Sequence, residues 1–134
     1  MMYYYFAYGS NLNQLQMSFR CPTATPIGAA VLRDYQLTER QFADIDKCPG
    51  KAVSGGLWLI TAADLHALDR YEGYPTFYMR YQGEVELPGG DTVDAIVYEM
   101  TAKAKADRDG LPYSEHYRQI CRVGGGDFQI ESTF

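Results

Sequence analysis

The chain has 134 residues, a length that suits one domain with a single buried core, and we expect residues 1–134 to form that domain. Its net charge is −5 and its Lys and Arg residues form no basic stripe, which disfavours binding to a nucleic-acid backbone. No apolar run approaches the roughly 18 residues of a membrane-spanning helix. No basic region precedes the apolar N-terminal run, so we expect neither a membrane segment nor a secretory signal.

The cysteine and histidine residues argue against a disulfide framework and against a metal site. Cys21, Cys48 and Cys121 are an odd number of thiols without close spacing, and reduced thiols indicate a cytoplasmic protein. His66 and His116 stand in no metal-binding motif. We therefore expect a cytoplasmic protein that holds no metal.

The first forty residues predict a strand, a turn, a short helix and a second strand. Residues 3–8 are apolar on both faces, which is typical of a central or barrel-forming strand. Gly9-Ser10-Asn11 forms a turn, and Ser10 or Asn11 can cap a helix that ends at Arg20-Cys21-Pro22. Residues 28–35 predict the second strand, and residues 36–40 can continue it.

The middle of the chain predicts a loop, a strand and a helix. Residues 41–51 are polar and turn-rich, and they separate the second strand from a third over residues 54–60. Thr61 can cap a helix in which Asp64 places a carboxylate in the first turn. Gly73 is a plausible C-terminal stop for that helix.

The next segment carries a strong hairpin signal. Residues 77–87 and 92–100 have the composition of strands, and they flank the turn Pro88-Gly89-Gly90-Asp91. Residues 103–110 are charged, and we expect them to form a mobile loop.

The C-terminal part predicts one more helix, which Ser114 can cap and which we expect to stop before Gly124-Gly125-Gly126. The chain as a whole then has at least five strands and two or three short helices. We interpret this pattern as an α+β protein in which a small mixed sheet curls toward a barrel.

Tyr8-Gly9-Ser10-Asn11-Leu12 is the first candidate site. Glycine lets the backbone turn sharply and approach a ligand, and Ser10 and Asn11 supply short hydrogen-bonding side chains. Backbone N–H groups at a helix start can also receive a carboxylate. A strand followed by Gly-Ser-Asn and a helix is equally an ordinary turn and cap, so the residues by themselves leave both interpretations open.

Glu72 is the second candidate, since it lies at the predicted end of its helix among apolar and aromatic residues. The negative end of the helix dipole and burial would both raise its pKa, and a carboxyl group of that kind exchanges protons near neutral pH. The alternative is a solvated glutamate beside a helix stop, which is the commoner situation for this residue type.

The twelve tyrosines can be explained by a β-rich core or by a pocket lined with phenolic hydroxyls. Tyr113 and Tyr117 stand one helical turn apart, and packing or pocket lining would suit them equally. The sequence contains no nucleophile elbow, no P-loop and no dinucleotide-binding fingerprint.

Nearly the whole chain resembles the γ-glutamyl cyclotransferase-like family, whose members include γ-glutamylamine cyclotransferases, a butirosin-biosynthesis protein and the plant avirulence-induced proteins. The landmarks that carry the resemblance occur in the family's order: Tyr5 to Leu12, Arg20-Cys21-Pro22, Leu68-Asp69 followed by Glu72-Gly73, Tyr78, and Ser114 with Tyr117. Tyr113 departs from the pattern, because it stands between Pro112 and Ser114 where the family often has Pro-Ser directly.

The resemblance implies a small six-stranded mixed β-barrel with peripheral short helices. It also implies a reaction without a cofactor, in which the α-amino group of a γ-glutamyl compound attacks its own γ-carbonyl and yields 5-oxoproline and a free amine or amino acid. Glu72 would be the general acid/base. The substrate would be held by Tyr8, Gly9, Ser10, Asn11, Leu12, Tyr78 and Tyr117.

Two other functions remain open at this level. The chain could be a non-catalytic module that binds a small molecule on the same fold, since fold does not fix function. Glu72 could instead activate water, and the product would then be glutamate. In each case the partner is a small molecule, with no role for nucleic acid or membrane, and the protein would act as a monomer or homodimer.

Overall fold

The computed structural model describes residues 1–134 and contains five strands, four α-helices and one short 3-10 helix. The strands are β1 (Met2–Ala7), β2 (Thr25–Arg40), β3 (Phe42–Thr61), β4 (Tyr78–Glu86) and β5 (Thr92–Met100). The helices are the 3-10 helix Ser10–Leu12, α1 (Gln14–Arg20), α2 (Ala62–Glu72), α3 (Ala102–Arg108) and α4 (Glu115–Asp127).

The five strands close into a barrel in the order β1-β3-β2-β4-β5. All neighbouring strands are antiparallel except β1 and β5, which run parallel and close the barrel. The expected fold class, α+β with a mixed barrel, is confirmed, although five strands are present where the resemblance implied six. The strands β2 and β3 are 16 and 20 residues long, and two register shifts between them let this long pair bend around the barrel.

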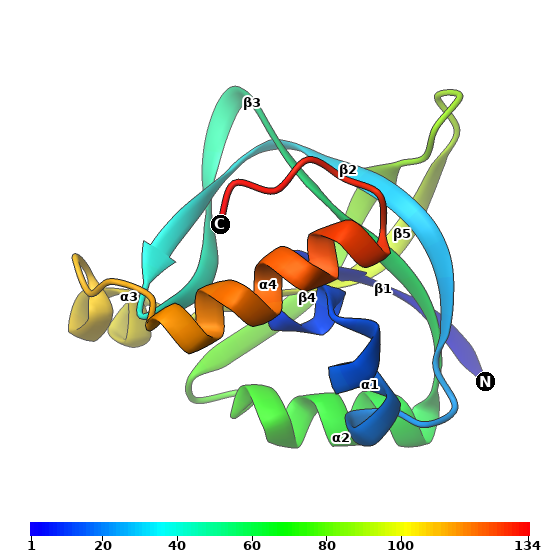
Figure 1. Ribbon diagram of the computed structural model, residues 1–134, viewed down its shortest axis with the longest axis horizontal. Coiled ribbons are helices and arrows are strands. Elements are labelled where there is room, and N and C mark those ends of the chain that lie inside the picture. The colour runs from blue at the N-terminus through cyan, green and yellow to red at the C-terminus, as the bar shows by residue number, and fades with distance from the viewer.

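The helices lie around the outside of the strands (Figure 1). The helix α4 crosses in front of the strands, α1 and α2 lie below them, and α3 lies beside the start of β3. Met17 of α1 and Leu68 of α2 are fully buried in one of two apolar clusters, which also contains Tyr5. Phe6 belongs to the other cluster, so β1 buries both of its faces, as the sequence predicts.

The helix α2 has both predicted termini. The Thr61 hydroxyl accepts from the Asp64 amide, and the Asp64 carboxylate accepts in turn from the Thr61 amide, which makes a capping box. Gly73 ends the helix in the left-handed conformation. The turn at residues 88–91 joins β4 to β5, so the predicted hairpin is also confirmed.

The prediction of a loop over residues 41–51 is wrong, because all of these residues except Gln41 form the first half of β3. Ala43, Asp44 and Ile45 are buried, and β3 pairs with β2 from Arg40↔Phe42 to Tyr35↔Lys47. The turn-like residues near Gly50 lie at a register shift, where the ladder is interrupted. Pairing with a long neighbouring strand therefore overrides the polar local composition.

The predicted loop over residues 103–110 is also wrong, since most of it is the helix α3. The Thr101 side chain caps this helix by accepting from the Ala104 amide. Ala104 is buried, and Lys105 makes ion pairs with Asp44 and Glu99. A buried contact and a set of ion pairs thus hold a segment that the charge pattern alone suggests is mobile.

Two helix boundaries differ from the sequence prediction. Asn13, not Ser10 or Asn11, caps α1, with its side chain accepting from the Gln16 amide. The helix α4 continues through the triple glycine to Asp127. At Gly124 an added Cβ would lie 2.5 Å from the Asn13 amide nitrogen, so glycine lets α4 rest directly on the loop that follows β1.

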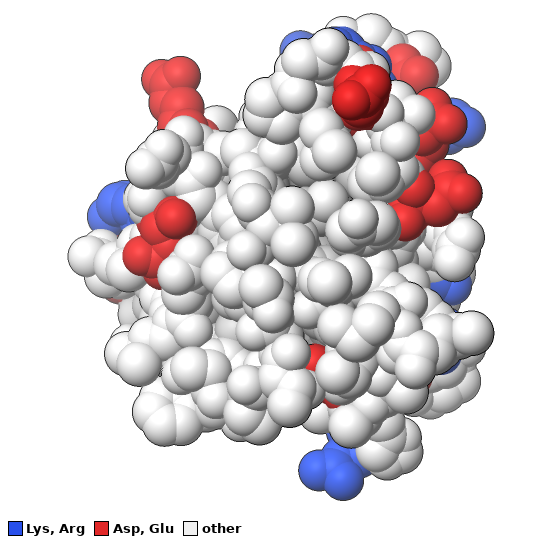
Figure 2. All heavy atoms as spheres, turned by 90° about the vertical axis from the view of Figure 1, so that its right-hand side faces the viewer, with Lys and Arg blue, Asp and Glu red and all other residues white.

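Charged side chains are sparse on the face shown in Figure 2 and lie mainly around its edge. None of the helices has the length and apolar character needed to cross a membrane. The expectation that the protein is a monomer or homodimer stays a prediction.

Candidate active site

A cavity of about 210 Å³ is lined by residues of β1, β3, β4, β5, α2 and α4 and of the loop and 3-10 helix that follow β1. Most of its lining is aromatic, and its residues are Tyr5, Phe6, Tyr8, Gly9, Ser10, Asn11, Phe42, Ala43, Tyr71, Glu72, Phe77, Tyr78, Tyr98 and Tyr117. The volume lies below the roughly 300–1,000 Å³ of pockets for drug-sized ligands, so it suits a small molecule.

Seven of the eight residues expected at the site line this cavity, and Leu12 does not. The Leu12 side chain is buried in the core cluster that contains Met17. Its amide donates to the Gly9 carbonyl oxygen at 3.1 Å, which closes the 3-10 turn. Neither group is therefore available to a ligand, and Leu12 supports the loop from behind.

Gly9 lies where the loop after β1 passes Tyr117, which stands in the first turn of α4. A Cβ at this position would lie 2.9 Å from the Tyr117 hydroxyl and 3.0 Å from the Ala43 Cβ, which is closer than a side chain can normally approach. The Gly9 amide makes no hydrogen bond within the chain. Because Gly9 lines the cavity, its N–H group is a candidate donor to an anionic or carbonyl oxygen.

Glu72 is the last residue of α2 and lines the cavity among tyrosine and phenylalanine rings. Burial raises the pKa of its carboxyl group to about 8, and the positive charge of Arg20 partly opposes that rise. The residue is half-buried, and its Oε1 lies 3.4 Å from the Asn11 Nδ2. A carboxyl group in this environment can gain and lose a proton near neutral pH.

Asn11 links Glu72 to two neighbouring side chains. Its Nδ2 donates to the Tyr5 hydroxyl at 3.0 Å and to the Glu72 Oε1 at 3.4 Å. Its Oδ1 accepts from Arg20. The Asn11 carbonyl oxygen also accepts from the Trp58 indole at 3.0 Å, so both the backbone and the side chain of this residue are fixed.

The three tyrosines expected to orient a substrate already make hydrogen bonds to the backbone. Tyr8 donates to the Tyr98 carbonyl oxygen at 2.6 Å, and Tyr78 donates to the Ala43 carbonyl oxygen at 2.7 Å. Tyr117 instead accepts from the Ala43 amide at 3.0 Å, which leaves its hydroxyl proton for another acceptor. Tyr8 and Tyr78 can thus accept from a ligand, whereas Tyr117 can donate to one.

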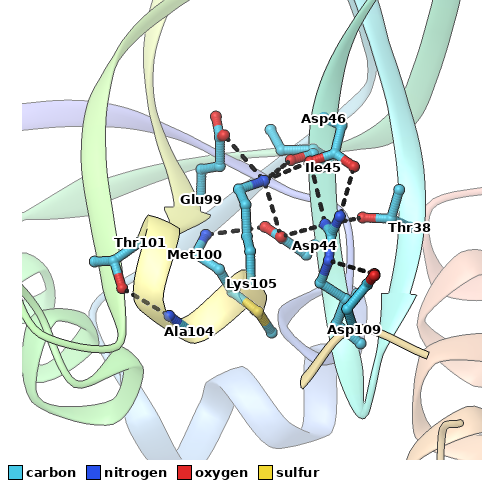
Figure 3. A network of polar contacts seen from close by, with 12 residues as sticks. Thr38, Asp44, Ile45, Asp46, Glu99, Met100, Thr101, Ala104, Lys105 and Asp109 are labelled. Atoms are coloured by element: carbon cyan, nitrogen blue, oxygen red, sulfur yellow. Dashed lines mark hydrogen bonds and ion pairs between the residues drawn. The ribbon is translucent and has the colours of Figure 1, made fainter. Parts of the chain in front are cut away.

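A network of charged side chains surrounds Asp44, the residue that follows Ala43 in β3 (Figure 3). The fully buried Asp44 carboxylate accepts from the Met100 amide at 2.9 Å, from Arg40 at 2.8 Å and from Lys105 at 3.0 Å. The start of β3 is thereby tied to β5 and α3. The position of Ala43, which contacts both Tyr78 and Tyr117, follows from this attachment.

Several cavity residues were not identified from the sequence: Tyr5, Phe6, Phe42, Ala43, Tyr71, Phe77 and Tyr98. Tyr5 and Tyr71 are close in sequence to predicted site residues, so proximity could have suggested them. Phe42 and Ala43 stand in the segment expected to be a loop, and only the pairing of β3 brings them to the cavity.

Comparisons with a family model and with curated proteins point to the same family. The family model described as Gamma-glutamyl cyclotransferase, AIG2-like, matches residues 5–119. Gamma-glutamylcyclotransferase from Bos taurus is 28% identical over 133 residues, which cover 90% of this chain and 68% of the relative. The protein of the same name from Homo sapiens is 29% identical over the same shares of the two chains.

Solved structures support the same relationship. A human protein superposes with a TM-score of 0.86 at 27% identity, covering 95% of this chain and 80% of the other. A gamma-glutamyl cyclotransferase superposes with a TM-score of 0.80 at 26% identity, covering 96% of this chain and 80% of the other. With the family model matched over most of its length, the chain belongs to the gamma-glutamyl cyclotransferase, AIG2-like family.

Proposed function

We propose that this protein is a γ-glutamyl cyclotransferase-type enzyme that releases 5-oxoproline and a free amine or amino acid from a γ-glutamyl compound. Family membership and the names of its relatives support the reaction class. The observation that carries the assignment is a single carboxyl group, Glu72, in an aromatic cavity beside the Gly9–Asn11 loop, with its pKa raised to about 8 by burial.

One carboxyl group is sufficient for this chemistry. The substrate's α-nitrogen forms a bond to its own γ-carbon, and the Glu72 carboxylate takes the proton that this nitrogen loses. The bond from the γ-carbon to the leaving nitrogen then breaks, and Glu72 gives that nitrogen the proton. The carboxylate is restored at the end of the cycle, and the nucleophile comes from the substrate itself, which removes the need for a catalytic triad.

The loop and Tyr117 supply donors where negative charge develops. The γ-carbonyl oxygen becomes an oxyanion during attack, and preorganised N–H and O–H donors stabilise such a charge. The Gly9 amide and the Tyr117 hydroxyl proton are both free of acceptors among the backbone groups at the cavity. We assign the oxyanion and the glutamyl carboxylate to donors of this loop, with Tyr8 and Tyr78 as acceptors for the substrate's amine.

The size of the cavity suits a cyclisation. A γ-glutamyl chain must fold back on itself before its nitrogen meets its carbonyl, and a small site can hold it in that form. The cavity volume of about 210 Å³ limits the room for extended conformers. Positioning of this kind adds to the effect of the acid/base group.

The test is 5-oxoproline release from a panel of γ-glutamyl amino acids and γ-glutamylamines, with the wild type and Glu72→Gln compared. General acid/base catalysis contributes about 10²–10⁴-fold, so we expect a loss of that order in the variant. Glu84→Gln is the matched control, because Glu84 is an exposed glutamate on β4 without an ion pair. It should release 5-oxoproline as the wild type does.

Two other outcomes would point to the alternatives. Release of free glutamate would indicate hydrolysis, with Glu72 activating water. If no panel member is converted, but some raise the melting temperature, the protein is a binding module on this fold. Normal turnover by a folded Glu72→Gln protein would exclude the proposed role of Glu72.

A further inference from the structure

The side chain of Arg20 reaches the candidate site from α1 but does not line the cavity. One guanidinium nitrogen, Nη1, donates to the Asn11 Oδ1, and the other, Nη2, donates to the Gln16 Oε1 at 2.8 Å. The guanidinium carbon lies 3.6 Å from the centre of the Tyr71 ring, over its face. Nη1 also donates to the Ser10 Oγ at 3.5 Å, so three hydrogen bonds and a stacked aromatic ring hold Arg20 in place.

Arg20 determines which way the Asn11 amide faces. A guanidinium group has donors and no acceptor, so the oxygen of the amide must point toward it. The NH₂ group of Asn11 must then point away, toward the Tyr5 hydroxyl and the Glu72 Oε1. Asn11 can donate to that oxygen whether Glu72 is ionised or protonated, because each form keeps an acceptor there.

We propose that Arg20 is a positioning residue, which acts through the Asn11 amide to hold the Glu72 carboxyl group in the orientation needed for proton transfer. This inference rests on the proposed function. It adds a residue that does not touch the substrate, and it assigns Asn11 to the orientation of Glu72 in addition to contact with a ligand.

Arg20 is also the charged group that acts on Glu72. The other titratable groups around that carboxyl are Tyr5 of β1, Tyr8 of the loop, Tyr71 of α2, Tyr78 of β4, Tyr98 of β5 and Tyr117 of α4. Burial raises the pKa of Tyr5, Tyr78 and Tyr117 well above 10, so these groups are neutral where Glu72 titrates. Arg20 forms no ion pair, and its charge is not cancelled by another carboxylate.

The first experiment measures the Glu72 carboxyl carbon by NMR across pH in the wild type and in Arg20→Met. Removing a positive charge makes the carboxylate less favourable, so we expect the titration midpoint of Glu72 to rise by about one unit, the lower end of the effect of a close opposite charge. Arg70→Met is the control, because Arg70 is an exposed arginine two residues from Glu72 without an ion pair or hydrogen bond from its side chain. The titration midpoint of Glu72 in Arg70→Met should match that in the wild type.

The second experiment measures kcat and KM for 5-oxoproline release. We expect Arg20→Met to lower kcat at least tenfold with a smaller change in KM, and to move the acidic limb of the pH profile of kcat/KM in parallel with the NMR midpoint. Asn11→Ala should lower kcat similarly. Since Arg20 acts through Asn11, the double variant should lose little more than Asn11→Ala alone.

Arg20→Lys keeps the proposal testable if Arg20→Met does not fold. Lysine retains the charge but lacks the planar group whose two nitrogens reach Asn11 and Gln16 separately, so it should leave the Glu72 midpoint near the wild-type value and still lower kcat. An unchanged midpoint together with an unchanged kcat in folded Arg20→Met would overturn the proposal, and so would fully additive losses in the double variant. Because the NMR titration needs no turnover, a protein without cyclotransferase activity would refute the proposed function separately from the effect of Arg20 on Glu72.

Discussion

Glu72, which lines the cavity of the candidate site, should also make the stability of the protein depend on pH. Burial raises its pKa to about 8 in the folded protein, against an ordinary value of 4.5. Between these two values the folded protein holds a proton that the unfolded chain releases. The free energy of unfolding therefore falls as pH rises from about 4.5 to about 8, by up to about 1.4 kcal/mol per pH unit.

Glu72→Gln removes this titration, so we expect the variant to gain stability relative to the wild type as pH increases. Urea unfolding of both proteins at pH 5 and pH 8 measures the difference. Groups other than Glu72 titrate equally in the two proteins, and their contributions cancel. Parallel pH dependences of the two proteins would mean that Glu72 is not desolvated in the folded state.

At the scale of elements, α4 depends on glycine where it meets the loop after β1. A Cβ at Gly124 would lie 2.5 Å from the Asn13 amide nitrogen and 2.6 Å from the Leu12 carbonyl carbon, and both are backbone atoms. Gly126, in the same helix, has no atom within 4 Å of an added Cβ. The two glycines thus form a matched pair.

We expect Gly124→Ala to lose roughly 1–3 kcal/mol of unfolding free energy, as overpacked sites do. Gly126→Ala should instead gain roughly 0.5–1 kcal/mol, because alanine loses less conformational entropy in a helix. Denaturant unfolding of both variants gives the comparison. A similar gain in both would show that α4 does not rest on the loop.

The helix α3 offers a second matched pair. Lys105 contacts the fully buried Asp44, whereas Lys103 pairs with Asp107 at the surface, where the two side chains are 83% and 51% exposed. Removing one partner of a buried ion pair is strongly destabilising, while an exposed pair contributes little.

Lys105→Met should accordingly lower the unfolding free energy by about 3 kcal/mol, the low end of the range for such losses because Arg40 still faces Asp44. Lys103→Met should change it by less than about 0.5 kcal/mol. Thermal or denaturant unfolding of the two variants checks this difference. Equal effects would mean that the Asp44 network does not anchor β3.

At the scale of the whole molecule, the fluorescence of the single tryptophan is sensitive to the Gly9–Asn11 loop, the barrel and α4 together. Trp58 of β3 is 3% exposed, donates to the Asn11 carbonyl oxygen at 3.0 Å, and packs edge-on against Phe128 with ring centres 5.5 Å apart. Any separate unfolding of the loop or of the end of α4 would change its fluorescence.

We expect Trp58 fluorescence and far-UV circular dichroism to give the same unfolding midpoint, since the barrel is closed and the helices pack on it. Measuring both signals in one denaturant titration is the check. A fluorescence change at lower denaturant would indicate that the loop opens before the barrel unfolds.

The sequence by itself determined the features that depend on neighbouring residues. Both ends of α2, the hairpin between β4 and β5, and the two buried faces of β1 follow from capping, turn and apolar patterns over a few positions. The family landmarks also placed Gly9 and Glu72 among the candidate residues, and both line the cavity. These signals are local, so the features that they predict can be identified without knowledge of the packing.

The tertiary structure alone decided what depends on distant contacts. Residues 42–51 belong to a strand because β2 pairs with residues 42–47, and residues 103–110 are largely helical because Lys105 and Ala104 meet the barrel. The pairing of β3 brings Phe42 and Ala43 to the cavity, where they meet residues from the other strands. Burial, which raises the pKa of Glu72, is likewise a property of the assembled fold, because desolvation comes from residues remote in sequence.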